Sequence, residues 1–301
     1  MEGLFLWGIT IVLALQAFST PALDGASLAL TQLGGEEVAL LIVPLVYWCL
    51  DKRFGVRLAY LFLLSFLANV WLKALFNTPR PYQYDPRVRL IGSPPHGSAF
   101  PSGHAKAATT MWGALAARVR RPPMWAVAAT VIALVSLSRI YLGVHFPHDA
   151  AGGIAFGVIA LLIFARIEPA VSVRLASLSF GAQITLSLVA SLALLMVFID
   201  RDSVTGSAVL AGLGIGYAMQ RRWASFSVSG SAGQRALRFA LGLVGVAAIY
   251  LCLRVAFGAI ATEEDTPLWY VLRFARYGLT GVWAGGLWPI IAVKLGLAND
   301  G

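Results

Sequence analysis

Long apolar stretches separated by short polar connections dominate the sequence. Hydrophobic residues make up 58% of the chain and charged residues only 12%, whereas an average soluble domain carries about 25% charged residues. Several stretches approach the roughly 20 residues that a helix needs to cross a hydrocarbon core of about 30 Å. Because backbone polar groups in lipid must bond within their own segment, the pattern predicts an all-α, polytopic transmembrane helical bundle.

The apolar stretches predict about ten helices, several of which must extend into their polar flanks to reach the length of a membrane span. The expected helical segments are residues 4–18, 38–50, 58–75, 105–117, 125–139, 149–165, 184–198, 208–219, 239–260 and 277–298. The first is short for a full crossing, so it is either a retained first span or one arm of a membrane-embedded hairpin. The connection over residues 19–35 is expected to be a loop.

Basic residues mark every second connection between these segments. They are Lys52, Arg53, Arg57, Arg118, Arg120, Arg121, Arg166, Arg174, Arg221, Arg222, Arg235 and Arg238. Because Lys and Arg concentrate in cytoplasmic loops, these connections are expected inside the cell and the others outside. These cytoplasmic Lys and Arg residues explain the net charge of +9. The sequence has no basic run interleaved with aromatic residues, so we expect no nucleic-acid partner.

One outer connection breaks the charge rule. The polar segment 73–106 contains Arg80, Arg87 and Arg89. Cations on the outer side of the membrane indicate a task other than setting the topology.

All four histidines of the chain fall between residues 96 and 148, at His96, His104, His145 and His148. Histidine is the side chain best suited to proton and group transfer near neutral pH. The clustering therefore predicts that the chemistry of the protein lies between residues 73 and 149.

The first of three motifs in this region ends a helix. Lys73 lies in the expected last turn, and Pro79 and Pro81 prevent the helix from continuing past Arg80. Taken alone, Lys73 is more often a partner of the helix dipole or a snorkelling residue, and Arg80 an ordinary interfacial arginine.

The second motif, Pro101-Ser102-Gly103-His104, begins a helix. Ser102 is a natural N-cap, and capping is the simplest explanation for it. The same geometry also presents amide N–H groups that bind phosphate oxygens, with Gly103 allowing close backbone approach. His104 would then lie next to a bound anion.

The third motif runs from Arg139, at the end of one segment, to Asp149, in the first turn of the next. An acid in a first turn is favoured by the helix dipole alone. His145 precedes Asp149 by four residues, and a carboxylate at this spacing can hold one ring nitrogen and leave the other free to attack.

The expected topology brings the three motifs to one membrane face. Three cations, helix amides and two histidines with a single nearby carboxylate suit a phosphate oxyanion. They do not suit magnesium or calcium, which require several carboxylates. Zinc on His104, His145 and His148 is conceivable, although the clustered cations disfavour it, and the distant pair Cys49 and Cys252 has no metal spacing. We therefore expect no metal and no cofactor.

The three motifs resemble the signature of the type-2 phosphatidic acid phosphatase superfamily. That signature has Lys, six residues and Arg-Pro; then Pro-Ser-Gly-His; then Ser-Arg, five residues, His, three residues and Asp. Every spacing is met in this chain. The superfamily includes lipid phosphatases, glucose-6-phosphatase and vanadium haloperoxidases. Residues 80–82 and 145–148 are also similar to glucose-6-phosphatase.

The resemblance covers roughly residues 36–168, which are expected to form a six-helix phosphatase core. The apolar pattern adds an N-terminal span or membrane-embedded hairpin at 1–35 and C-terminal transmembrane helices of unassigned role at 169–301. The resemblance also implies that His145 is the nucleophile that forms a phosphohistidine, that Asp149 orients His145, and that His104 protonates the leaving oxygen. The residues implied to bind the phosphoryl oxygens are Lys73, Arg80, Ser102, Gly103 and Arg139.

These inferences predict a metal-independent phosphoric monoester or diphosphate hydrolase that acts at the outer, periplasmic face of a bacterial cytoplasmic membrane. The expected substrate is a lipid phosphate or pyrophosphate, such as undecaprenyl pyrophosphate, phosphatidylglycerol phosphate or phosphatidic acid, with membrane lipids as surroundings. The alternatives are a sugar-phosphate phosphatase resembling glucose-6-phosphatase, a non-catalytic lipid-phosphate transporter, and a vanadate-dependent haloperoxidase.

Overall fold

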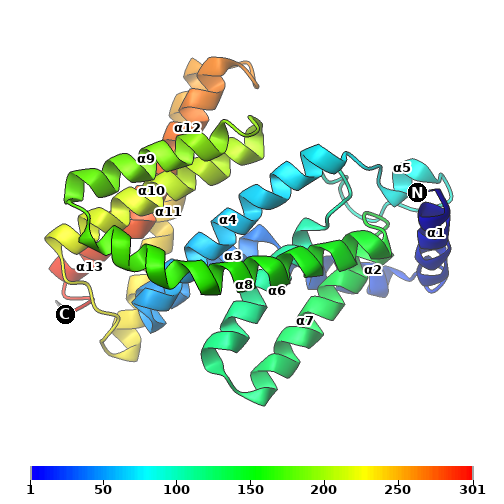
Figure 1. The fold of residues 1–301 in the computed structure, drawn as a ribbon, viewed down its shortest axis with the longest axis horizontal. Helices are drawn as coiled ribbons and strands as arrows, with labels where there is room; N and C mark the ends of the chain where they lie inside the picture. Colours follow the sequence, from blue (N-terminus) through cyan, green and yellow to red (C-terminus); the bar gives the residue numbers. More distant parts are fainter. Residues whose placement is uncertain (1, 300–301) are drawn as a thin grey trace. The chain divides into compact units, whose positions relative to one another are not determined.

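The computed structural model describes residues 2–299, which form helices joined by loops (Figure 1). The elements are α1 (Glu2–Gln16), α2 (Pro21–Gln32), α3 (Glu36–Leu45), the π-helical η1 (Val46–Leu50), α4 (Lys52–Phe76), α5 (Pro81–Tyr84), α6 (Gly103–Val119), α7 (Pro122–Tyr141), α8 (Pro147–Ser177), α9 (Phe180–Leu195), α10 (Arg201–Trp223), α11 (Ala232–Ile260), α12 (Pro267–Val282), the π-helical η2 (Trp283–Leu287) and α13 (Trp288–Lys294). The predicted all-α class is confirmed.

Fewer helices than expected have the length and hydropathy of a membrane span. Within residues 2–299, four segments qualify: Lys52–Tyr84, Pro122–Tyr141, Pro147–Ser177 and Ala232–Ile260. The pair formed by α2 with α3 and η1, bent by 44°, is a broken span or a re-entrant loop. Helices α6, which has 17 residues, and α10 fall short of these limits; both are rich in small residues such as Ala, Gly and Thr, and most of their residues are buried. Such small residues allow helices to pack closely inside a membrane bundle.

The chain divides into two compact units. The first comprises Met1–Leu41 and Ala68–Arg166, and the second comprises Ile42–Leu67 and Ile167–Gly301. All three motifs belong to the first unit. The sequence-based division at residues 35 and 168 stays a proposal.

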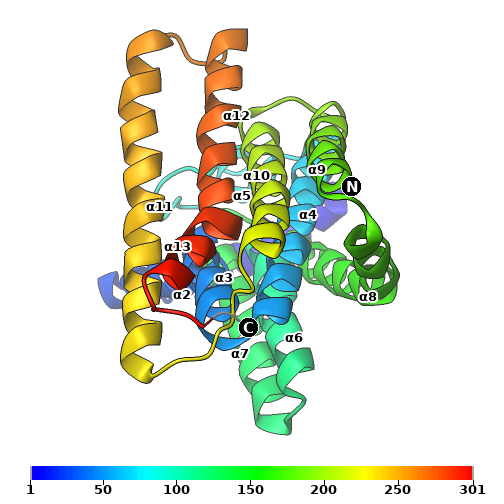
Figure 2. The ribbon, with the colours of Figure 1, turned by 90° about the vertical axis from the view of Figure 1, so that its left-hand side faces the viewer.

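In the first unit, α6 and α7 form an antiparallel pair, and α2 packs against α7 (Figures 1 and 2). The turn between α6 and α7 places Arg120 in the left-handed region, with φ of 57°, and Pro122 then begins α7. Helix α8 approaches α6 so closely that a Cβ added at Gly153 would lie 2.5 Å from the carbonyl oxygen of Ser102. Glycine at this position therefore brings the first turns of α6 and α8 together.

Two expectations about helix bounds are wrong. The stretch 19–35 is not a loop but contains α2, which begins with Thr20 as N-cap and Pro21 in its first turn. Thr-Pro is a helix start signal, but the modest hydropathy of this short helix concealed it. The expected end of α8 is near residue 165, yet the helix continues through Pro169 to Ser177. A proline inside a helix removes one backbone hydrogen bond, and α8 continues in spite of that loss.

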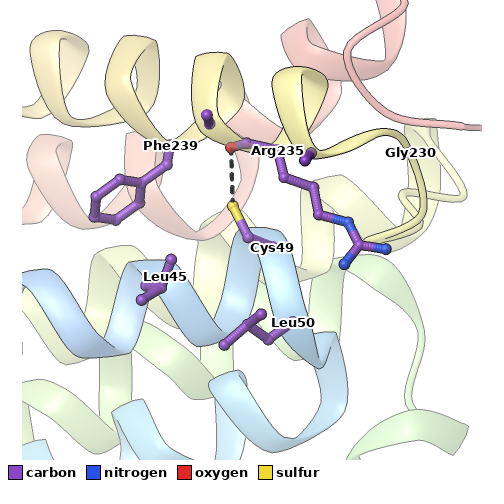
Figure 3. Close-up of a pocket in the computed structure, with 8 residues that line it drawn as sticks. Leu45, Cys49, Leu50, Gly230, Arg235 and Phe239 are labelled. Atoms are coloured by element: carbon purple, nitrogen blue, oxygen red, sulfur yellow. Dashed lines mark hydrogen bonds between the residues drawn. The ribbon is translucent and has the colours of Figure 1, made fainter.

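In the second unit, α10 packs against α9, α12 and η2, and α11 runs beside α12 (Figure 2). A shallow cavity of about 590 Å³ lies between the end of η1 and the start of α11 (Figure 3). The thiol of Cys49 donates to the carbonyl oxygen of Arg235 across it, at 3.3 Å. Its lining residues are Leu45, Cys49, Leu50, Gly230, Ala232, Arg235, Ala236 and Phe239, so it contains none of the predicted site residues.

Candidate active site

Lys73 occupies the last turn of α4, as its position before the prolines predicts. Its ammonium group donates to the carbonyl oxygen of Ser98 in the loop that precedes α6. A Cβ added at Gly103 would lie 3.9 Å from Cε of Lys73. The first motif and the second motif are therefore adjacent in space.

Arg80 is fully buried, with 1% of its surface exposed, and its guanidinium group is largely occupied by loop carbonyls. Nε donates to Gly97 at 3.1 Å, Nη1 to Val144 at 2.9 Å, and Nη2 to His96 at 2.9 Å and to Ser98 at 3.2 Å. These bonds use four of the five N–H groups of arginine. Arg80 thus organises the loops around the site and retains one donor.

The Pro-Ser-Gly-His motif begins α6, as predicted. Ser102 is the N-cap, and its hydroxyl accepts from the amide of Ala105 at 3.4 Å. Its own amide donates to the carbonyl oxygen of Asp149 at 3.0 Å. His104 follows in the first turn and is half-buried. The amide groups at this helix end and the imidazole therefore lie next to the start of α8, which carries the third motif.

Arg139 lies in the last turn of α7 with only 8% of its surface exposed. Its carbonyl oxygen accepts from the amides of Val144 and His145, both at 3.3 Å, and so fixes the turn that leads to α8. Its Nη1 donates to the hydroxyl of Thr31 at 3.1 Å. Its buried Nε has no hydrogen-bond partner within residues 2–299, so that donor can be offered to a ligand.

His145 and Asp149 form a buried pair at the start of α8. Nδ1 of His145 lies 3.5 Å from Oδ2 of Asp149, and the amide of Phe146 donates to the same oxygen at 2.7 Å. The two side chains are 2% and 0% exposed. The imidazole–carboxylate distance is longer than a hydrogen bond, which is common for catalytic pairs that tighten when a substrate binds.

The surroundings of His145 keep its imidazole neutral. Burial is the main cause that lowers the pKa of His145 well below its ordinary value, and the positive charges of Lys73, Arg139 and Arg80 lower it further. His104 acts in the same direction. A neutral imidazole is the nucleophilic form, and the three predicted cations are close enough to act on it.

His148 contacts the carboxylate of Asp149, which the sequence did not indicate. Its Nε2 lies 3.4 Å from Oδ1 of Asp149, and its ring stacks on Phe146 with centroids 5.1 Å apart. Phe5 of α1 packs against both rings, at 5.1 Å from Phe146 and 5.6 Å from His148. His148, the second residue of α8, thus belongs to the surroundings of the site.

The structure places the predicted site residues at the ends of α4, α6, α7 and α8 and, for Arg80, at the N-cap of α5. His96 is exposed, and its backbone carbonyl accepts from Nη2 of Arg80. Sequence reasoning missed Thr31, because a threonine in a short apolar helix carries no signal that separates it from an ordinary buried hydroxyl. Among residues 2–299, no group of three or more His, Cys, Asp and Glu side chains is arranged to hold a metal ion.

Comparison with known proteins identifies the family. Residues 54–172 match the PAP2 superfamily, and residues 204–300 match the PAP2 superfamily phosphatase, transmembrane extension. An undecaprenyl-diphosphatase from Sulfolobus acidocaldarius is 28% identical over 148 residues, which cover 48% of this chain and 71% of that protein. A glucose-6-phosphatase catalytic subunit 1 from Haplochromis nubilus is 23% identical and is covered over 55% of its length. The crystal structure of LpxE from Aquifex aeolicus aligns with 27% identity and a TM-score of 0.48, over 52% of this chain and 93% of that one.

The chain belongs to the PAP2 superfamily, which confirms the resemblance drawn from the three motifs. It is an integral membrane protein and a phosphatase of this family. The relatives are matched over about half of the present chain.

Proposed function

We propose that this protein hydrolyses a lipid phosphate or pyrophosphate through a phosphohistidine on His145. The observation that carries the proposal is the buried His145–Asp149 pair, which lies within reach of the charges of Lys73, Arg80 and Arg139. Phosphoryl transfer depends mostly on positioning and charge stabilisation, which is what such an arrangement supplies.

In the first step, the neutral Nε2 of His145 attacks phosphorus, and the bond from phosphorus to the leaving oxygen breaks. Arg139 and the amide groups at the start of α6, with Ser102 and Gly103, stabilise the phosphoryl oxygens, together with Lys73 and the remaining donor of Arg80. His104 donates a proton to the leaving oxygen. The carboxylate of Asp149 accepts a hydrogen bond from Nδ1–H of His145 and offsets the positive charge that develops on the imidazole ring.

In the second step, water attacks the phosphohistidine and the N–P bond breaks, which releases phosphate and restores neutral His145. His104, which has lost its proton, accepts one from the attacking water, so that both steps use the same imidazole. The cations hold the phosphoryl group in place throughout, because its negative charge persists in both transition states.

A lipid substrate is favoured by two observations. Three of the helices whose ends build the site, α4, α7 and α8, are long and apolar enough to cross a membrane, and the head group of an anchored lipid lies at such helix ends. A relative from Sulfolobus acidocaldarius, matched over 148 residues, is an undecaprenyl-diphosphatase. The positive-inside pattern supports an active site at the periplasmic face of a bacterial cytoplasmic membrane.

The test is phosphate release by the purified protein in detergent, with lipid phosphates, lipid pyrophosphates and sugar phosphates assayed side by side. We expect turnover of a lipid substrate and its loss in His145→Ala. Turnover of glucose 6-phosphate alone would favour the sugar-phosphate alternative, consistent with the relative of that name. Binding without turnover would favour a transporter, and oxidation of halide by peroxide with vanadate would favour a haloperoxidase.

A further inference from the structure

Arg139 is held by a residue that lies far from all three motifs in the sequence. Its Nη1 donates to the hydroxyl of Thr31 in the last turn of α2, at 3.1 Å and across 108 residues of chain. Thr31 is 3% exposed and Arg139 is 8% exposed. A buried hydrogen bond of this length restricts a long and flexible side chain to one orientation.

The helix that carries Thr31 is fixed to α7 at its other end. The carboxylate of Asp24, in the first turn of α2, accepts from the hydroxyl of Tyr141 and pairs with Arg89 at 2.9 Å. Tyr141 is the last residue of α7, two positions after Arg139. Helix α2 is therefore anchored beside the residue whose side chain it holds.

The end of α1 fixes the same region through its backbone. The side-chain amide of Gln16 donates to the carbonyl oxygens of Arg89 and Tyr141, at 2.7 Å and 2.9 Å, and its oxygen accepts from the amide of Arg89 at 3.0 Å. These contacts join α1, the loop before α6 and the end of α7. The position of Arg139 thus depends on residues 2–33, which precede the family segment 54–172.

We propose that Thr31 is a positioning residue for the phosphate site, which sets the guanidinium group of Arg139 so that its remaining donors point at the phosphoryl oxygens. The buried Nε of Arg139, without a partner within residues 2–299, is the donor that this orientation makes available. The N-terminal helices then complete the phosphate site. This inference rests on the function proposed above, because it requires Arg139 to bind the phosphoryl group.

The experiment compares Thr31→Val, which keeps the shape but removes the hydroxyl, with Thr31→Ser, which keeps the hydroxyl. The matched control is Ser27→Ala, which removes a buried hydroxyl one turn earlier on α2. Thr31→Val should lower kcat/KM and raise the inhibition constant of orthovanadate by about 3- to 10-fold each, the usual effect of losing one hydrogen bond. Thr31→Ser and Ser27→Ala should retain the wild-type values within about 2-fold.

A second set of variants tests whether Thr31 acts through Arg139 or whether its substitution disturbs the protein in general. In Arg139→Gln, whose side chain has lost the guanidinium group, adding Thr31→Val should cause no further loss, because interacting residues are non-additive. Equal losses in both backgrounds, or an unchanged inhibition constant in Thr31→Val, would overturn the inference. If Thr31→Val does not fold, Thr31→Ala in the same two backgrounds decides the question.

Failure of the proposed function gives a different result. In that case wild-type protein releases no phosphate from any lipid, or His145→Ala remains active. An active wild type, an inactive His145→Ala and a fully active Thr31→Val would leave the phosphatase mechanism intact and refute only the role of Thr31.

Discussion

The amide of Ser102 donates a hydrogen bond of 3.0 Å to the carbonyl oxygen of Asp149. This bond joins the N-cap of α6 to the first turn of α8. It therefore connects the phosphate-binding motif directly to the motif that carries the proposed nucleophile. The closeness depends on Gly153, one turn further along α8.

Gly153→Ala should therefore disturb both stability and catalysis. The added Cβ would lie 2.5 Å from the carbonyl oxygen of Ser102 and 3.1 Å from Cβ of Ala105, so α8 must move away from α6. We expect a lower Tm and a loss of kcat of roughly 10-fold or more, because small displacements of catalytic groups cost rate. The control is Gly25→Ala in α2, where a Cβ has no neighbour within 4 Å. A wild-type Tm and kcat in Gly153→Ala would contradict the packing described here.

Asp149→Asn should leave the fold intact and slow the chemical step. An amide can still accept from the amide of Phe146, but it cannot offset the charge that develops on His145. We expect kcat to fall roughly 100- to 10,000-fold, the range for loss of acid–base assistance. Single-turnover phosphate release measures this directly, with Asp85→Asn in the loop after α5 as the control. A loss below about 10-fold would argue against the orienting role of Asp149.

His148→Phe should have a smaller effect. Phenylalanine preserves the stacking on Phe146 but removes the nitrogen that lies 3.4 Å from Oδ1 of Asp149. Because this contact supports the carboxylate without touching the phosphoryl group, kcat should fall by about 3- to 10-fold. Adding His148→Phe to Asp149→Asn should cost nothing more. An additive loss would show that His148 acts independently of Asp149.

The pH dependence of catalysis should reflect the lowered pKa of His145. A nucleophilic imidazole must be neutral, and it is neutral above its pKa, so this group should not limit kcat until the pH falls well below 6.5. Removing the charge of Lys73 raises that pKa, so the acid limb of Lys73→Met should move to higher pH. Arg121→Gln, which removes an exposed charge at the start of α7, should not shift it. Profiles of kcat from pH 4 to pH 8 make the comparison.

Metal removal should not affect turnover if phosphate is activated by fixed side-chain charges alone. After dialysis, the protein should release phosphate at the same rate with and without EDTA. Orthovanadate should inhibit, because it mimics the phosphoryl group during transfer. Restoration of lost activity by zinc or magnesium would show that the site recruits an ion.

The sequence predicted those parts of the molecule that follow from local rules. Apolar length gave the helical class, and the prolines after Lys73 and the serine before Gly103 gave the helix ends at the site. Local rules could not predict contacts between distant segments. Thr31 and Gln16 look ordinary in their own stretches, and only the packing of α1 and α2 against α7 gives them neighbours at the site.

Helix bounds failed where two rules competed. Helix α2 has a start signal at Thr20 and Pro21 but little hydropathy, so the apolar pattern predicts a loop there. The predicted boundary at residue 168 precedes Pro169, although α8 continues past this proline for two further turns.

The loop before α6 accepts hydrogen bonds from side chains that are also proposed to bind the substrate. Lys73 donates to Ser98, and Arg80 donates to His96, Gly97 and Ser98. The same two cations therefore hold segment 96–98 and face the proposed phosphate site. Substitutions in this loop should change the position of Lys73 and Arg80, and with it how tightly the substrate is held.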